Sequence, residues 1–133
     1  MNAVLEGLEP VRVFYYFEQL SRIPHGSGNT GKISGYLVSF AKEHGLEYIQ
    51  DELGNVVIFK AGTKDAPPVI LQGHMDMVAE KRPDSGHDFE KDPLVLEVEG
   101  DNLTARDTTL GGDDVIALAY ALAIPSSPPS VYR

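Results

Sequence analysis

Two dense apolar stretches lie near opposite ends of the chain, and each predicts a helix with a buried face. The first covers residues 11–20 and is followed by Pro24. The second covers residues 115–123, which are apolar without interruption. A proline has no amide hydrogen and clashes with the preceding turn, so we expect the second helix to end at Pro125.

A further helix is predicted between these two, after a pair of residues that can cap its start. Asn29 and Thr30 are both suitable N-caps, and Gly45 is a suitable stop. Between them the apolar positions recur every three or four residues, as on one face of a helix: Ile33, Tyr36, Leu37, Phe40 and Ala41. This pattern indicates packing and implies no chemistry.

Short runs of β-favouring residues predict strands. Residues 46–50 and 55–60 flank a turn at 51–54, so we expect them to pair as a hairpin. Residues 94–98 precede a second turn, and the continuous apolar run at 69–71 suits a strand covered on both faces. Together with the helices, these strands predict an α/β fold in which a mixed sheet is flanked by helices.

The length of 133 residues fits one domain. We assign residues 1–124 to that domain. Residues 125–133 are rich in proline and serine and change composition abruptly, so we predict a disordered tail there.

Charge and composition exclude several classes of function. Eleven Lys and Arg against twenty Asp and Glu give a net charge of −9, which disfavours binding to nucleic acid or to an anionic membrane. The chain has no cysteine, so any metal must be held by His, Asp and Glu. We find no signal peptide and no stretch long enough to span a membrane, and we therefore expect a cytoplasmic location.

The most informative polar motif is His74-Met75-Asp76, which directly follows the predicted strand at 69–71. Open α/β sheets place ligand sites at the ends of strands. In extended backbone His74 and Asp76 point to the same side, which suits a metal-binding imidazole with a carboxylate to orient it. An isolated motif of this kind is more often a structural histidine bonded to a local carboxylate.

A second polar segment, residues 105–114, brings Asp113 and Asp114 to the start of the last predicted helix. Aspartates at such a position usually act as N-caps that are stabilised by the helix dipole. The two segments together favour a metal site more than either does alone.

With these segments in view, the chain resembles the aminoacyl-histidine dipeptidases (Xaa-His dipeptidases, peptidase D), within the two-zinc aminoacylase-like metallopeptidases. The resemblance runs from about residue 11 to residue 124, and the stretch His87-Asp88-Phe89-Glu90-Lys91-Asp92-Pro93 is its most specific part. The other matching segments are residues 21–25, 51–55, 69–78 and 103–114. The resemblance implies the N-terminal portion of a zinc-peptidase catalytic domain, truncated before half of the active site.

By this resemblance His74 is a zinc ligand, Asp76 orients it as a catalytic residue, and Asp113 bridges two zinc ions, although other divalent metals are possible. It also implies a cis peptide bond after Asp113. Two residues depart from the family pattern: Asp107 replaces a common glycine, and Val115 stands where a glycine usually begins the helix.

The family's glutamate base and its later ligands are absent from the chain. The remaining acidic candidates, Glu80, Glu97 and Glu99, match solvated strand and loop positions better. The other histidines, His25, His44 and His87, are likewise better explained as surface or loop residues than as ligands.

The resemblance implies zinc-dependent hydrolysis of dipeptides, with Xaa-His dipeptides as the small peptide substrates. We expect the chain alone to be inactive and to expose an apolar face through which it could form a homo-oligomer. A non-catalytic remnant or binding module is the main alternative. A single-zinc hydrolase that uses Glu80 or Glu99 as its base is a third.

Overall fold

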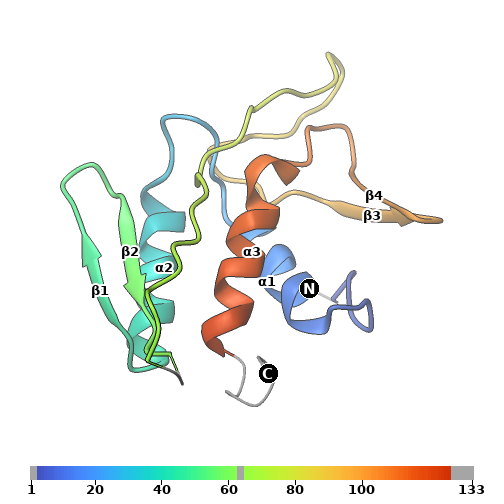
Figure 1. Ribbon diagram of the computed structural model, residues 1–133. Helices are drawn as coiled ribbons and strands as arrows, with labels where there is room; N and C mark the ends of the chain where they lie inside the picture. The colour runs from blue at the N-terminus through green and yellow to red at the C-terminus, as the bar shows by residue number, and fades with distance from the viewer. Residues whose placement is uncertain (1–2, 63–64, 127–133) are drawn as a thin grey trace.

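The computed structural model describes residues 3–62 and 65–126, which form three helices and two hairpins (Figure 1). The helices are α1 (Val11–Ser21), α2 (Gly31–Glu43) and α3 (Gly112–Ser126). The strands are β1 (Glu47–Gln50), β2 (Val56–Phe59), β3 (Leu96–Glu99) and β4 (Asn102–Ala105). None of the helices in these described residues is long and apolar enough to cross a membrane.

Helices α1 and α3 pack against each other and form the centre of the core. On α1, Val13, Phe17 and Leu20 are spaced three or four residues apart and are all buried. On α3, Leu118 and Leu122 face them from a helix whose own residues are almost all apolar. These two apolar faces exclude water from one another, and their burial is the main stabilising contribution within this part of the chain.

Helix α2 is joined to the β1–β2 hairpin by side-chain hydrogen bonds as well as by apolar packing. The buried hydroxyl of Ser34 donates to the carbonyl oxygen of Gly54 at 2.6 Å, and the Gln50 side chain donates to the same hydroxyl at 2.8 Å. Asp51 closes the hairpin turn, because its carboxylate accepts the backbone N–H groups of Leu53 and Asn55. The predicted helix start at Thr30 is confirmed, although Thr30 makes no side-chain cap hydrogen bond.

The α/β class is confirmed, but the prediction of one mixed sheet is wrong for the described residues. Strands β1 and β2 pair antiparallel, and so do β3 and β4, as two separate two-stranded sheets. Residues 69–71 were expected to be a covered strand, yet they form no strand. They run as an extended segment near β2 and α3 (Figure 1), and none of the strands in the described residues pairs with them.

Two predictions about the C-terminal end have different outcomes. Helix α3 includes Pro125 and ends at Ser126, so the prediction that Pro125 ends the helix is wrong. A proline at this position removes a single backbone N–H donor, and no later turn of α3 follows that a kink would displace. The remainder of the predicted tail, residues 127–133, lies outside the described residues, so the proposed division at residue 124 stays a prediction.

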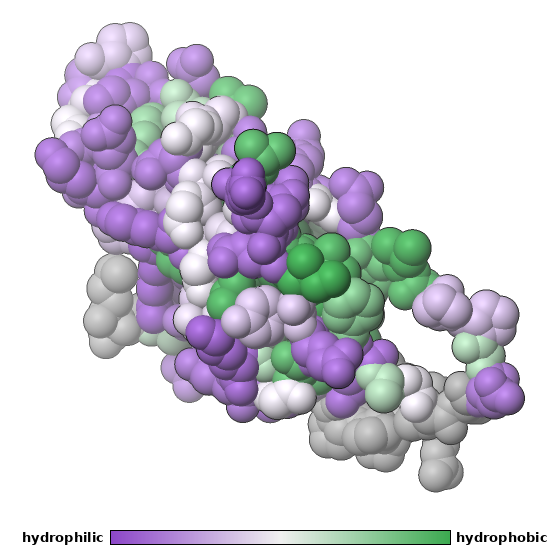
Figure 2. Space-filling model, turned by 90° about the vertical axis from the view of Figure 1, so that its left-hand side faces the viewer, coloured by the Kyte–Doolittle hydropathy of each residue, from purple (hydrophilic) through white to green (hydrophobic). Residues whose placement is uncertain are grey.

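Apolar side chains are exposed on the side of the molecule that carries β1 and β2. Figure 2 shows hydrophobic residues lying open between hydrophilic ones on this face. The most exposed are Ile70 at 87% and Val69 at 84% in the extended segment, together with Leu53 at 85% in the turn between β1 and β2. A continuous apolar run that finds no cover within the described residues is typical of a surface that packs against further polypeptide.

Candidate metal centre

The segment that contains His74 is held by the loop that follows α1. The backbone N–H of Met77 donates to the carbonyl oxygen of His25 at 3.0 Å, and the N–H of Ser27 donates to the carbonyl oxygen of Met77 at 3.1 Å. Met77 and His25 are both buried. Residues fifty or more positions apart in the sequence are therefore fixed side by side.

The imidazole of His74 has an acidic side chain at each ring nitrogen. Its Nδ1 lies 3.0 Å from Oδ1 of Asp76 and 3.0 Å from the Asp76 carbonyl oxygen. Because both neighbours only accept hydrogen bonds, Nδ1 carries a hydrogen. The other nitrogen, Nε2, lies 3.0 Å from Oδ1 of Asp113.

Asp113 and Asp114 stand at the start of α3, where the backbone is not yet helical. The peptide bond between them is cis, as the resemblance implied. The side chain of Asp113 is 96% exposed, and His74 is its only side-chain partner among the described residues. The carboxylate of Asp114 accepts a long hydrogen bond of 3.4 Å from the backbone N–H of His74.

The electrostatics of the site follow from these contacts. The pKa of His74 is raised, chiefly because Asp113 stabilises the protonated ring, and Asp76 adds to the effect. The pKa of Asp76 is lowered, chiefly because the hydroxyl of Ser27 donates to its carboxylate. The arrangement thus favours a positive charge beside Nε2, which either a proton or a metal ion supplies.

Two glycines allow the His74 segment to approach the start of α3 closely. A Cβ on Gly73 would lie 2.8 Å from a carboxylate oxygen of Asp114. A Cβ on Gly111 would lie 3.0 Å from Sδ of Met77 and 3.3 Å from Nε2 of His25, and Gly111 has a φ of +73°. A side chain at either position would press on these neighbours and oppose the close approach of the two segments.

Both departures from the family pattern have local explanations. Asp107 adopts a φ of +61°, a conformation that glycine prefers and that aspartate tolerates better than most residues, and it pairs with Arg82. Val115 is 1% exposed and belongs to the hydrophobic core. Its side chain therefore packs inward beneath the helix start.

The other candidate residues lie outside this arrangement. Glu97 pairs with Arg106 on the β3–β4 hairpin, and Glu80 and Glu99 are exposed, in agreement with solvated strand and loop positions. Among the histidines, His44 is exposed and His87 is half-buried in a loop. Within residues 3–62 and 65–126, no group of three or more His, Asp or Glu side chains could hold a metal ion.

His25 lies in the loop after α1, as expected, but it is buried and does not lie at the surface. It is 1% exposed, and its Nδ1 lies 2.6 Å from the carbonyl oxygen of Ile23. Its Nε2 has no hydrogen-bond partner among the described residues. Burial lowers the pKa of His25, and the folded chain therefore favours the neutral form of the ring.

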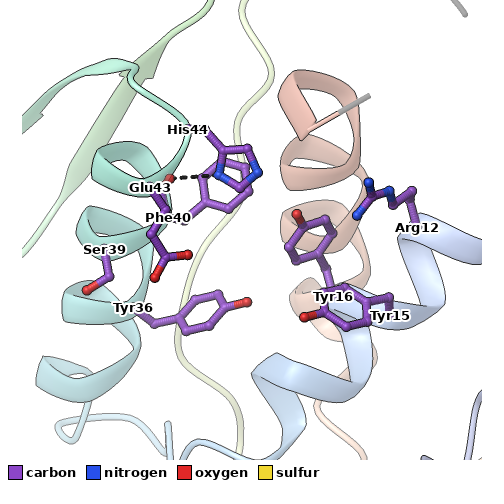
Figure 3. Close-up of a pocket in the computed structure, with 8 residues that line it drawn as sticks. All are labelled: Arg12, Tyr15, Tyr16, Tyr36, Ser39, Phe40, Glu43 and His44. Carbon is purple, nitrogen blue, oxygen red and sulfur yellow. Dashed lines mark hydrogen bonds between the residues drawn. The ribbon is translucent and has the colours of Figure 1, made fainter. Parts of the chain in front are cut away.

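A separate pocket of about 260 Å³ lies between α1 and α2 (Figure 3). It is lined mainly by aromatic rings, with Arg12 and Glu43 at its edges. Burial and the neighbouring tyrosines raise the pKa of Tyr36, so the hydroxyl of Tyr36 stays protonated at neutral pH. The lining contains neither His74 nor the aspartates around it, and the pocket is therefore distinct from the candidate metal centre.

The chain is similar in sequence and in fold to known peptidases. No family model matches the chain. The chain is 41% identical over 123 residues to the cytosol non-specific dipeptidase of Escherichia coli, a match that covers 90% of this chain and 25% of that protein.

Solved structures give the same picture. The fold is similar to that of an aminoacylhistidine dipeptidase from Vibrio alginolyticus, with a TM-score of 0.88 at 36% identity, over 92% of this chain and 26% of that one. It is also similar to a tripeptidase from Staphylococcus aureus, with a TM-score of 0.69 at 26% identity, over 86% of this chain and 31% of that one.

The resemblance to dipeptidases that the sequence predicted is thus confirmed over most of the chain, and the proteins it resembles are peptide hydrolases. The chain spans about a quarter of the length of the curated relative that it matches.

Proposed function

We propose that this chain forms part of a zinc-dependent dipeptidase and supplies one side of its active site. The observation that carries this proposal is the contact of His74 Nε2 with Asp113 Oδ1 at 3.0 Å, while Nδ1 of the same ring is bonded to Asp76. Sequence similarity to dipeptidases over most of the chain supports it.

The donor set fits a zinc ion. A hydrogen on Nδ1 leaves a lone pair on Nε2, and a lone pair beside a carboxylate oxygen is repulsive unless a cation or a proton lies there. Zinc binds nitrogen and oxygen at about 2.0–2.2 Å, and two such ligands of one ion lie about 3 Å or more apart. His74 would bind through Nε2, and Asp113 would bind through its carboxylate and could bridge two ions.

When bound, zinc lowers the pKa of a coordinated water and polarises the scissile carbonyl of a peptide substrate. The residues of this chain prepare the site for that chemistry. Asp76 keeps the hydrogen on Nδ1 of His74 and fixes the orientation of the ring. Asp113 projects its carboxylate from the start of α3 into solvent, where an ion and a substrate have access.

The proposed substrates are dipeptides, including Xaa-His dipeptides, and the proposed location is the cytosol. Both rest on the names of the similar proteins. We further propose that the chain alone has no measurable activity. Catalytic zinc sites commonly use three protein ligands and a positioned base, whereas the described residues bring together only His74 and Asp113.

Calorimetry with zinc, together with an assay on an Xaa-His dipeptide, tests this proposal. We expect weak zinc binding that is lost in His74→Ala and no turnover by the chain. His44→Ala is the matched control, because His44 is also an exposed histidine but lies at the C-terminal end of α2, as its C-cap. Unchanged zinc binding in His74→Ala would place the metal elsewhere, and turnover that depends on His74 would contradict the proposed inactivity.

A non-catalytic binding module is the second candidate, and the exposed apolar segment at residues 69–71 favours it. In this case the segment would pair with a strand of a second copy of the chain or of another protein, since sheet edges bind partners in this way. Light scattering separates the candidates. Stable self-association without zinc binding would support the module, and a zinc-binding monomer would contradict it.

A further inference from the structure

Ser27 contacts the proposed metal centre through the carboxylate of Asp76. Its hydroxyl donates to Oδ2 of Asp76 at 2.6 Å, a length typical of a hydrogen bond to a charged acceptor. The carbonyl oxygen of Met77 is a second and more distant acceptor at 3.3 Å. Among the described residues no histidine nitrogen accepts from the Ser27 hydroxyl, so Ser27 lacks the imidazole base that activates a catalytic serine.

Backbone hydrogen bonds fix the position of Ser27 in this contact. Residues 26 and 77 form a parallel bridge, and the N–H of Ser27 donates to the carbonyl oxygen of Met77. The N–H of Asn29 closes a turn onto the carbonyl oxygen of Gly26 at 2.8 Å. The hydroxyl therefore lies at a fixed place relative to Asp76, even though Ser27 itself is exposed.

The two carboxylate oxygens of Asp76 contact different residues in this geometry. Oδ2 accepts from Ser27, and Oδ1 faces Nδ1 of His74. Rotation of the carboxylate would break both contacts together. The hydroxyl of Ser27 thereby acts on the histidine ring without touching it.

We propose that Ser27 is a positioning residue, whose hydroxyl holds Asp76 in the orientation that keeps the hydrogen of His74 on Nδ1 and leaves Nε2 available to a ligand. That the ligand is a metal ion rests on the proposed function. The effect on the ring tautomer does not rest on it, because every group involved belongs to this chain.

The test is NMR of the metal-free chain at a pH where His74 is neutral, using two-bond proton–nitrogen correlations to measure its ratio of Nδ1–H to Nε2–H tautomers. We expect Ser27→Ala to shift this ratio roughly three- to tenfold toward Nε2–H, the range that corresponds to one net hydrogen bond. The loss is incomplete because the Asp76 carbonyl oxygen also accepts from Nδ1. Ser27→Thr keeps the hydroxyl and should restore the ratio.

Two variants make the result decisive. Ser39→Ala removes an exposed serine hydroxyl from α2 and should leave the ratio unchanged. Asp76→Asn introduces an amide that can donate to Nδ1, and it should move the ratio further toward Nε2–H than Ser27→Ala does. An unchanged ratio in Ser27→Ala, or an equal shift in Ser27→Ala and Ser27→Thr, would overturn the proposal.

Zinc titration of the same variants distinguishes this inference from the proposed function. If the tautomer ratio depends on Ser27 but the wild-type chain binds no zinc, the positioning role stands and the metal proposal fails. If zinc binds through His74 but the ratio ignores Ser27, the metal proposal stands and the positioning role fails.

Discussion

Asp76 and Asp113 lie at opposite nitrogens of the same imidazole, but the chain supports them very differently. Asp76 is held by the hydroxyl of Ser27, and the next residue along the chain, the buried Met77, is hydrogen-bonded to the backbone of the buried His25. Asp113 is 96% exposed and touches only His74 among the described side chains. We call these the Asp76 side and the Asp113 side of the site.

This difference indicates which half of the site is ordered by the fold itself. The Asp76 side is organised by contacts within the chain and needs no ion for its geometry. The Asp113 side presents a charge that nothing in the described residues neutralises except a protonated His74. A cation would therefore change the surroundings of Asp113 more than those of Asp76. This difference is expected if Asp113 binds the ion while Asp76 is already oriented by the fold.

The largest expected effect comes from forcing the two sides apart at Gly111. In Gly111→Ala the new Cβ would press on Met77 and His25, and the residue would keep a φ of +73° that disfavours a side chain. We expect a loss of about 2–4 kcal/mol in the free energy of unfolding, the sum of overpacking and left-handed backbone strain. Denaturant unfolding measures it.

Gly45→Ala is the matched control for this prediction. Gly45 also has a positive φ, of +64°, but nothing lies within 4 Å of its added Cβ. Its cost should be the backbone strain alone, about 1–2 kcal/mol. Equal losses in the two variants would show that the two sides of the site are not tightly packed at Gly111.

The sequence predicted the contact between residues that are close together in the chain and missed the contacts between residues that are far apart. His74 and Asp76 are two positions apart, so strand geometry alone placed the two side chains together. Ser27 reaches Asp76 across 49 residues, and no periodicity or spacing in the sequence carries that information. The same holds for His25, whose burial depends on Gly111 and Met77 far along the chain.

The secondary-structure predictions show the same difference between local and long-range information. The helix over residues 11–21 was predictable because its apolar positions follow a helical period. Residues 69–71 have equally clear apolar character, but a strand also needs a neighbour, and none of the described strands pairs with them. Apolar patterning therefore identified a segment that requires cover, while its secondary structure depends on what covers it.

The second prediction concerns the pH dependence of stability, to which the histidines of the site contribute with opposite sign. Burial lowers the pKa of His25 below its usual 6.5. As the pH falls below 6.5, His25 binds a proton in the unfolded chain but stays neutral in the folded chain. The free energy of unfolding therefore decreases progressively until the pH reaches the folded pKa of His25. The pKa of His74 is raised, so its contribution is present below 6.5 and is lost as the pH rises through the folded value.

Unfolding free energies of the wild type and of His25→Gln between about pH 5 and 7 test this prediction, a window set by the usual histidine pKa. The wild type should lose stability relative to the variant as the pH falls, by less than about 1.4 kcal/mol per pH unit, the limit for one titrating group. His44→Gln serves as the control, because His44 is exposed. Parallel curves for the wild type and His25→Gln would mean that the ring is not held neutral in the folded chain.

The smallest expected effect is that of Asp113→Asn on the stability of the metal-free chain. Because the Asp113 side chain is almost fully exposed, we expect a change within about 0.5 kcal/mol, as for most surface substitutions. Asp76→Asn should cost more, about 1–2 kcal/mol, because the hydroxyl of Ser27 would lose a charged acceptor and the amide would compete for Nδ1 of His74. Denaturant unfolding of both variants without metal tests this comparison. If Asp113→Asn lost as much free energy of unfolding as Asp76→Asn, the Asp113 side would also stabilise the fold, and its exposed carboxylate would have a role besides binding an ion.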